Sequence, residues 1–115
     1  MAQIEEAAAR RKACACASAY NEFLNLARSA RDMARIPTLD EGQKVSIADV
    51  MERILDSLSA AENACAVNFN DEKNFIKNNR PPGTTPIGMW TPPSGRQFGE
   101  VIASANTKIR TCSTS

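Results

Sequence analysis

The feature that most constrains the fold is one apolar stripe within residues 46–67. Its members are separated by alternating steps of four and three residues, a spacing that aligns side chains along one side of an α-helix. They are Ile47, Met51, Ile54, Leu58, Ala61 and Cys65. Ser46 is the expected N-cap, with Asp49 at the third position of a capping box. Such a narrow stripe needs a partner surface, and Val50 and Leu55 widen the stripe.

The preceding residues 2–35 are predicted to form that partner. They lack Gly and Pro and are rich in alanine, the best helix former. Their own stripe consists of Cys16, Ala19, Phe23, Leu26, Ala30 and Met33, flanked by Tyr20, Ala27 and Ala34. Pro37 ends this helix, and the connector 36–45 is short enough to join antiparallel neighbours. We therefore expect a helical hairpin in which residue 16 lies near residue 65.

The chain changes character after Val67. A short helix over residues 71–78 is expected to bury Phe75 and Ile76. Residues 80–95 hold five of the six prolines and three of the five glycines, a composition that excludes regular helix or central strand. Ser94 is expected to cap a last helix at about residues 96–110. Its apolar face consists of Phe98, Val101, Ile102, Ala105 and Ile109.

The predicted fold class is all-α within one domain. A long antiparallel helical hairpin occupies residues 1–68. A short helix and an extended Pro/Gly-rich arm follow over residues 69–95, and a C-terminal helix with a polar tail over residues 96–115. Only 21 of the 115 residues are Leu, Ile, Val or Phe, about 18%, which is little material for a self-sufficient core. We therefore expect the chain to complete its burial against other chains.

The four cysteines, Cys14, Cys16, Cys65 and Cys112, do not have the spacing of a zinc site. Cys14 and Cys16 are two apart in a predicted helix, so they point away from each other. We expect Cys14, Cys16 and Cys65 to behave as small buried hydrophobic residues. A Cys16–Cys65 disulfide and a metal site are the alternatives.

The location expected from the sequence is intracellular (cytoplasmic) or a virion. The N-terminal residues do not form a recognisable secretory signal. Residues 13–19, where its apolar core would lie, contain only Ala, Cys and Ser, and Glu5 and Glu6 occupy what would be its basic leader. No apolar run approaches the roughly 18 residues that a transmembrane helix needs, so no membrane association is expected. An intracellular setting is usually reducing.

Enzymatic activity is not expected, and neither is a cofactor. The chain has no histidine, the commonest general base and metal ligand, and no phosphate-binding or nucleophile motif. The neighbouring acids Asp71 and Glu72 lie in a polar segment and are expected to be solvated. Glu52 and Asp56, one turn apart, are expected on an exposed helix face rather than at a metal.

The predicted contact surface combines the surplus of the central stripe with the arm and the last helix. Its residues are Val50, Leu55, Ile87, Met89, Trp90, Phe98 and Ile102. Trp90 is the only tryptophan, and tryptophan is enriched at binding hot spots. It is expected either to fold back on its own hairpin or to insert into a neighbouring subunit. An SH3-type ligand is not expected, because no P-x-x-P occurs in the arm.

Arg28, Arg31 and Arg35 share one helix face and are the candidate phosphate contacts; a solvated face is the alternative. The net charge of +1 provides no general attraction to nucleic acid or to anionic membrane. The expected function is that of a non-enzymatic structural subunit of a homo-oligomeric assembly, for example a virion component such as a head–tail adaptor, connector or capsid-associated protein. The alternatives are a helical protein-binding adaptor or regulator, and a small nucleic-acid-binding protein that uses the arginine face.

Overall fold

The computed structural model describes residues 2–109, with side chains from Cys16 onward. Within this range the chain is helical and contains no strand, which confirms the all-α prediction. The elements in chain order are α1 (Ala2–Ala34), α2 (Glu41–Cys65), α3 (Asn70–Asn78), the single 3₁₀ turn η1 (Ile87–Met89) and α4 (Gly95–Lys108). None of these helices is both long enough and apolar enough to cross a membrane.

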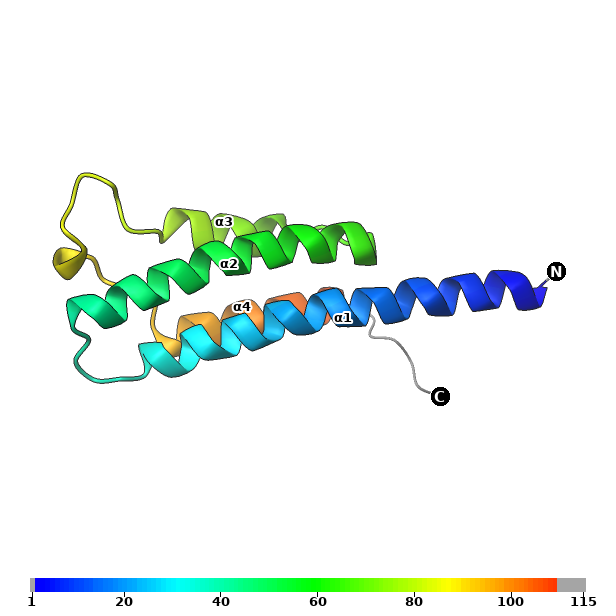
Figure 1. Cartoon of the computed structure of the whole chain (residues 1–115), viewed down its shortest axis with the longest axis horizontal. Helices are drawn as coiled ribbons and strands as arrows, with labels where there is room; N and C mark the ends of the chain where they lie inside the picture. Colours follow the sequence, from blue (N-terminus) through cyan, green and yellow to red (C-terminus); the bar gives the residue numbers. More distant parts are fainter. Residues whose placement is uncertain (1, 110–115) are drawn as a thin grey trace.

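The helices form two layers. α1 and α2 run antiparallel in one layer, and α3 and α4 lie behind them (Figure 1). Each helix packs against two neighbours in the cyclic order α1, α2, α3, α4. α4 is antiparallel to α1, because its first residue Gly95 lies against Arg31 and Arg35 while Asn106 near its end bonds Tyr20. The N-terminal part of α1 extends beyond the other helices.

The observed helix boundaries follow from local chemistry. α1 ends at Ala34, one residue short of the expected end and shortly before Pro37. α2 begins at Glu41, so the prediction of an N-cap at Ser46 is wrong. Asp40 caps the helix instead: its carboxylate accepts from the Gln43 N–H at 2.7 Å, and the Gln43 side chain accepts from the Asp40 N–H at 2.9 Å. This reciprocal box overrides the weaker Ser46 signal.

The prediction that Ser94 caps the last helix is confirmed. Its hydroxyl accepts from the Gln97 N–H at 3.2 Å, and the Gln97 side chain accepts from the Ser94 N–H at 2.8 Å. Gly95 then allows a close approach between α4 and α1. A Cβ at this position would lie 2.8 Å from Cγ of Arg35 and 3.2 Å from the carbonyl oxygen of Arg31. A larger residue would therefore push the two helices apart.

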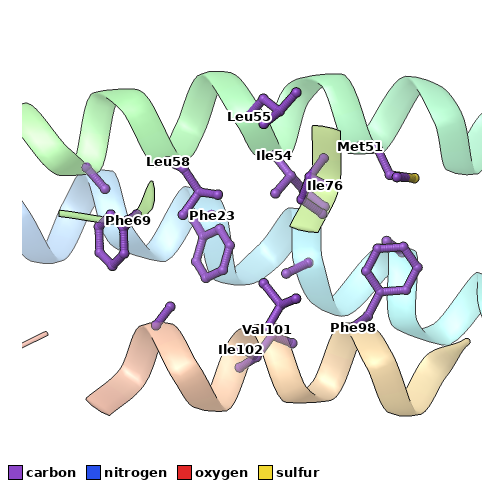
Figure 2. Close-up of a cluster of buried hydrophobic side chains, with 14 of the residues drawn as sticks. Phe23, Met51, Ile54, Leu55, Leu58, Phe69, Ile76, Phe98, Val101 and Ile102 are labelled. Atoms are coloured by element: carbon purple, nitrogen blue, oxygen red, sulfur yellow. The ribbon is translucent and has the colours of Figure 1, made fainter. Parts of the chain in front are cut away.

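The core lies between the two layers (Figure 2). The predicted stripe of α2 is confirmed from Ile47 to Ala61, whose members are fully buried. The stripe of α1 is rotated from the prediction: Tyr20 and Ala27 are buried, whereas Leu26 and Met33 are only half-buried. The reason is that α1 contacts α4 as well as α2, and α4 lies against the flank of α1 that carries Tyr20, whose hydroxyl bonds Asn106. All five predicted apolar residues of the last helix are buried.

Residues 80–95 pack on their own chain. In a turn of this segment, the Thr85 N–H donates to the Pro82 carbonyl at 3.2 Å. The following 3₁₀ turn, η1, lies on the first turns of α2, where the Lys44 ammonium donates to the Gly88 carbonyl at 2.7 Å. Trp90 is buried, and its indole N–H donates to the Asn79 carbonyl at 3.1 Å. Of the two placements expected for Trp90, the structure therefore has the one within its own chain.

Candidate functional site

A disulfide joins α1 to the end of α2. Cys16 and Cys65 are bonded, with their Cα atoms 4.7 Å apart. The expectation that these two cysteines are only small buried residues is therefore wrong. The antiparallel register brings the two positions together, and the alanines of α1 allow the backbones to come within disulfide range. Cys14 and Cys112 lie outside the residues whose side chains are described.

A buried carboxylate forms the centre of the α3–α4 layer. Glu72 is 2% exposed, so the expectation that it is solvated is wrong, although its neighbour Asp71 is exposed. The Lys108 ammonium lies 2.6 Å from Oε1 of Glu72, and the Ser104 hydroxyl donates to the same carboxylate at 2.9 Å. The Glu72 hydrogen bond, assisted by Asp71 and opposed by burial, raises the pKa of Lys108.

Tyr20 connects α1 to this polar layer. Its hydroxyl donates to the side-chain oxygen of Asn106. Its ring stacks on Phe69 and lies tilted against the ring of Phe23. Burial, together with the charge of Glu72, raises the pKa of Tyr20 to about 12, although Arg28 acts in the opposite direction. Tyr20 is thus a neutral hydrogen-bond donor throughout the physiological pH range.

A second ionic contact attaches α3 to α2. The Glu62 carboxylate accepts from the Phe69 N–H at 2.8 Å and pairs with the Lys73 ammonium at 2.5 Å. Burial on its own would raise the pKa of Glu62. The hydrogen bonds from Lys73 and Phe69, with the charges of Lys73 and Lys77, outweigh burial and lower that pKa. Glu62 therefore positions the start of α3, which has no side-chain cap of its own.

A small cavity of about 170 Å³ opens beside Glu72 between α3 and α4. Its lining combines Phe75 and Val101 with the carboxylates of Asp71 and Glu100. Ligand pockets usually measure about 300 Å³ or more, so this cavity has space for only a very small guest. Among the described side chains, no group of three His, Cys, Asp or Glu residues lies close enough to hold a metal ion.

Glu72, Ser104 and Lys108 join α3 to α4 through their polar contacts, and the Tyr20 hydroxyl joins α1 to α4. Tyr20 and Lys108 retain their protons well above neutral pH, so neither matches the pKa that acid–base catalysis at pH 7 requires. Ser104 donates to Glu72, and the chain has no histidine to activate that hydroxyl as a nucleophile. Every buried side-chain nitrogen and oxygen in the described part of the chain has a hydrogen-bond partner.

The residues of the predicted contact surface are divided between the core and the surface. Leu55, Trp90, Phe98 and Ile102 are buried within their own chain and are not accessible to a partner in this conformation. Val50 and Ile87 are half-buried, and Met89 is 76% exposed. The structure does not bring the seven residues together on one accessible surface.

One end of the molecule carries exposed large apolar side chains. Ile36 lies in the connector after α1, Val45 on the first turns of α2 and Met89 on η1, with exposures of 38%, 44% and 76%. Connector, helix start and η1 all lie at the same end of the bundle (Figure 1). We call these three residues the apolar end. The predicted contact surface includes Met89 but not Ile36 or Val45, which belong to the predicted connector 36–45.

The arginine face is partly neutralised. Asp32 lies between the three arginines in sequence, and its carboxylate is 3.4 Å from Nε of Arg31 and 3.5 Å from a guanidinium nitrogen of Arg35. Arg35 also packs against Gly95 of α4. Arg28 is exposed. The three side chains thus share a face, but two of them already have a carboxylate partner.

A groove of about 510 Å³ runs between α1 and α2. It is lined by Glu22, Leu26, Arg53, Asp56, Ser57 and Ala60. The α3–α4 layer packs on the other side of the hairpin, so this groove remains uncovered. None of its charged residues is among the predicted site residues, because in the sequence each is an ordinary polar position on the outer face of a helix.

Comparison with protein-family models, with curated proteins and with solved structures finds no match for this chain.

Proposed function

We propose that this protein is a non-enzymatic structural subunit that self-associates into a homo-oligomeric assembly. The observation that carries the proposal is the apolar end. Met89, at 76% exposure, projects from a segment that is itself held on α2 by the Lys44–Gly88 hydrogen bond. An exposed methionine on a supported surface is typical of a contact surface, because its flexible thioether adapts to a partner.

The disulfide supports an assembly that functions outside a reducing compartment. Structural disulfides persist in extracellular settings and on virion surfaces, and they are rare in the cytosol. Of the two expected locations, the virion therefore fits better than the cytoplasm. A connector, head–tail adaptor or capsid-associated protein is the finer proposal, which depends on the architecture rather than on any chemistry of the site.

The two alternative functions have less support. An adaptor for a different protein would use the same exposed surfaces, and no contact favours a foreign partner over a second copy. A nucleic-acid-binding function would use Arg28, Arg31 and Arg35. Asp32 already pairs with two of these, and phosphate binding would first have to displace that carboxylate.

Size-exclusion chromatography with light scattering tests the proposal on the oxidised full-length chain. The wild type is expected to elute as a multiple of its 12.5 kDa mass at micromolar concentration. Val45→Gln with Met89→Gln should shift the protein toward the monomer, because the two apolar contacts are lost. Asn63→Gln, at another exposed position of α2, is the matched control and should leave the mass unchanged. A wild-type monomer at every concentration would contradict the proposal.

A further inference from the structure

Two of the four cysteines are joined, which leaves one further pair to consider. Cys16 and Cys65 form the disulfide between α1 and α2. Such a bond indicates that the chain is oxidised where it functions, since structural disulfides are rare in reducing compartments. With Cys16 and Cys65 paired, Cys14 and Cys112 are the two cysteines left that can form a bond within the chain. Whether they can meet depends on their positions relative to the described helices.

The register between α1 and α4 places residues 14 and 112 at the same end of the bundle. Tyr20 of α1 bonds Asn106 of α4, and the two helices are antiparallel. Residue 14 is six positions before Tyr20, and residue 112 is six positions after Asn106. Both therefore lie beyond the Tyr20–Asn106 contact in the same direction. Position 14 is about 9 Å from Tyr20 along the axis of α1.

The chain after α4 is long enough to cover this distance. α4 ends at Lys108, and Ile109 has extended backbone angles and is buried, so the chain still contacts the bundle as it leaves the helix. From Asn106, two helical steps and four extended steps reach residue 112 over as much as about 16 Å. The span along the axis uses about 9 Å of this length, and the remainder allows the segment to pass around α1.

Position 14 is also on a suitable face of α1. Helical residues are about 100° apart, so Tyr20 lies roughly 40° around α1 from Cys16, and Arg35 roughly 100°. Position 14 lies roughly 160° from Cys16 in the same direction. Cys16 faces α2, whereas Tyr20 and Arg35 contact α4. Position 14 is thus on the flank of α1 that continues from α4 and is turned away from α2.

We propose that Cys14 and Cys112 form a second disulfide, which fastens the C-terminal segment to α1. The thiolate of one cysteine attacks a low-molecular-weight disulfide and releases one of its two thiols; the other cysteine then attacks the mixed disulfide and releases the second thiol. Both cysteines lose their protons as the S–S bond forms, and the two electrons reduce the donor disulfide to two thiols.

This bond has a consequence for the assembly that goes beyond the proposed function. With Cys16 paired to Cys65 and Cys14 paired to Cys112, all four cysteines of the chain are used within one subunit. Subunits of the oxidised protein then associate without covalent bonds between them.

Intact-mass spectrometry of the oxidised full-length chain under denaturing conditions tests the proposal. The unreduced wild type should take up no alkyl group from iodoacetamide, and it should gain about 4 Da on reduction, since each reduced bond adds two hydrogen atoms. In non-reducing gel electrophoresis it should migrate as a 12.5 kDa monomer. Cys112→Ser should take up one alkyl group, because Cys14 loses its partner. Ser113→Ala, at the adjacent position, is the matched control and should behave as the wild type.

The double variant Cys16→Ser with Cys65→Ser isolates the second bond. Trypsin should release residues 13–28 joined to residues 111–115, a linkage that reductant removes. Absence of this linked pair from the folded variant would overturn the proposal. Two alkyl groups on the unreduced wild type would overturn it as well, and so would a dimer in the non-reducing gel that reductant converts to monomer. The wild-type results decide the question even where the double variant does not fold, and none of them depends on the self-association that the proposed function requires.

Discussion

Each layer of this molecule consists of two packed helices, and the contacts that join the two helices differ between the layers. The α1–α2 layer is joined by an apolar stripe on each helix and by the Cys16–Cys65 disulfide. In the α3–α4 layer the helices are joined by a charged side chain and its hydrogen-bond donors: the Glu72 carboxylate of α3 accepts from Ser104 and Lys108 of α4. The first arrangement depends on the shape of side chains and a covalent bond. The second depends on the protonation of a few groups.

This difference predicts how the layers respond to conditions. Apolar contacts between α1 and α2 are largely indifferent to pH, and the disulfide responds to reductant. The α3–α4 contact responds to alkaline pH, because the pKa of Lys108 is raised. The contact that attaches α3 to α2 responds to acid, because the pKa of Glu62 is lowered. A change in reductant therefore tests the contacts of the α1–α2 hairpin, and a change in pH tests the ionic contacts of α3 and α4.

Removal of the disulfide should produce the largest effect. Cys16→Ala with Cys65→Ala releases a loop spanning 49 residues in sequence, which costs about 4 kcal/mol in the chain-entropy description. Urea unfolding of the oxidised wild type and the double variant measures the difference. The reduced wild type should behave like the reduced variant. A loss below about 1 kcal/mol would show that the apolar stripe alone holds the α1–α2 layer.

Loss of Lys108 should be the next largest effect. Lys108→Met leaves the buried Glu72 carboxylate with Ser104 as its remaining partner and should cost about 2–3 kcal/mol, reduced from the fully buried case because Lys108 is partly exposed. Lys77→Met, at an exposed position of α3, is the control and should change stability by less than about 0.5 kcal/mol.

A double variant sharpens this result. Lys108→Met with Glu72→Leu removes both charges and should recover most of the loss, because two apolar residues need no ionic partner. Thermal or urea unfolding at pH 7 compares it with each single variant. Equal losses for the single and double variants would mean that packing, rather than charge, holds the α3–α4 layer.

Alkaline pH should weaken the contact between α1 and α4. Folding raises the pKa of Tyr20 from 10.0 to about 12, so the unfolded chain releases this proton first. The stabilisation is therefore complete below pH 10 and is lost as pH rises toward 12. Tyr20→Phe should lower stability by about 1 kcal/mol at pH 8 and reduce the additional loss between pH 10 and 12. An unchanged alkaline profile in this variant would exclude Tyr20 as the titrating group.

Acid should produce the smallest effect, at the junction of α2 and α3. Folding lowers the pKa of Glu62 from its usual 4.5, so its stabilisation is complete above that pH and is lost as pH falls through the lowered value. Lys73→Met should raise the pKa of Glu62 and flatten this acid dependence. Nuclear magnetic resonance titration of the Glu62 carboxyl checks the direction; a pKa above 4.5 in the wild type would contradict it.

The buried stripe of α2 and two of the helix ends could be predicted from the sequence because the information that sets them is local. Pro37 ends α1, the spacing of the α2 stripe identifies its buried face, and Ser94 caps α4. Glu72 was missed because nothing near it in sequence indicates burial; its partners Ser104 and Lys108 are 32 and 36 residues away. Tyr20 was placed on a flank, since only the docking of α4 makes that flank interior.

The candidate contact surfaces were harder to predict for a related reason. Tryptophan is a residue type that is enriched at binding hot spots, yet the segment that carries Trp90 folds back and buries it, while Met89 stays exposed. The groove depends on which side of the hairpin the α3–α4 layer covers. No periodicity within a single helix contains that information, so the residues that line the groove look like ordinary surface positions until the layers are assembled.

The central claim, that the apolar end is a contact surface within an assembly, is tested most directly by the oxidation of Met89. Peroxide converts accessible methionine to the sulfoxide, and the fully buried Met51 in the same chain is an internal reference. Mass spectrometry of the two peptides gives both rates over a dilution series. We predict that Met89 reacts rapidly in dilute protein and more slowly, in proportion to the assembled fraction, as concentration rises. A Met89 rate that stays equally fast at every concentration would contradict the account.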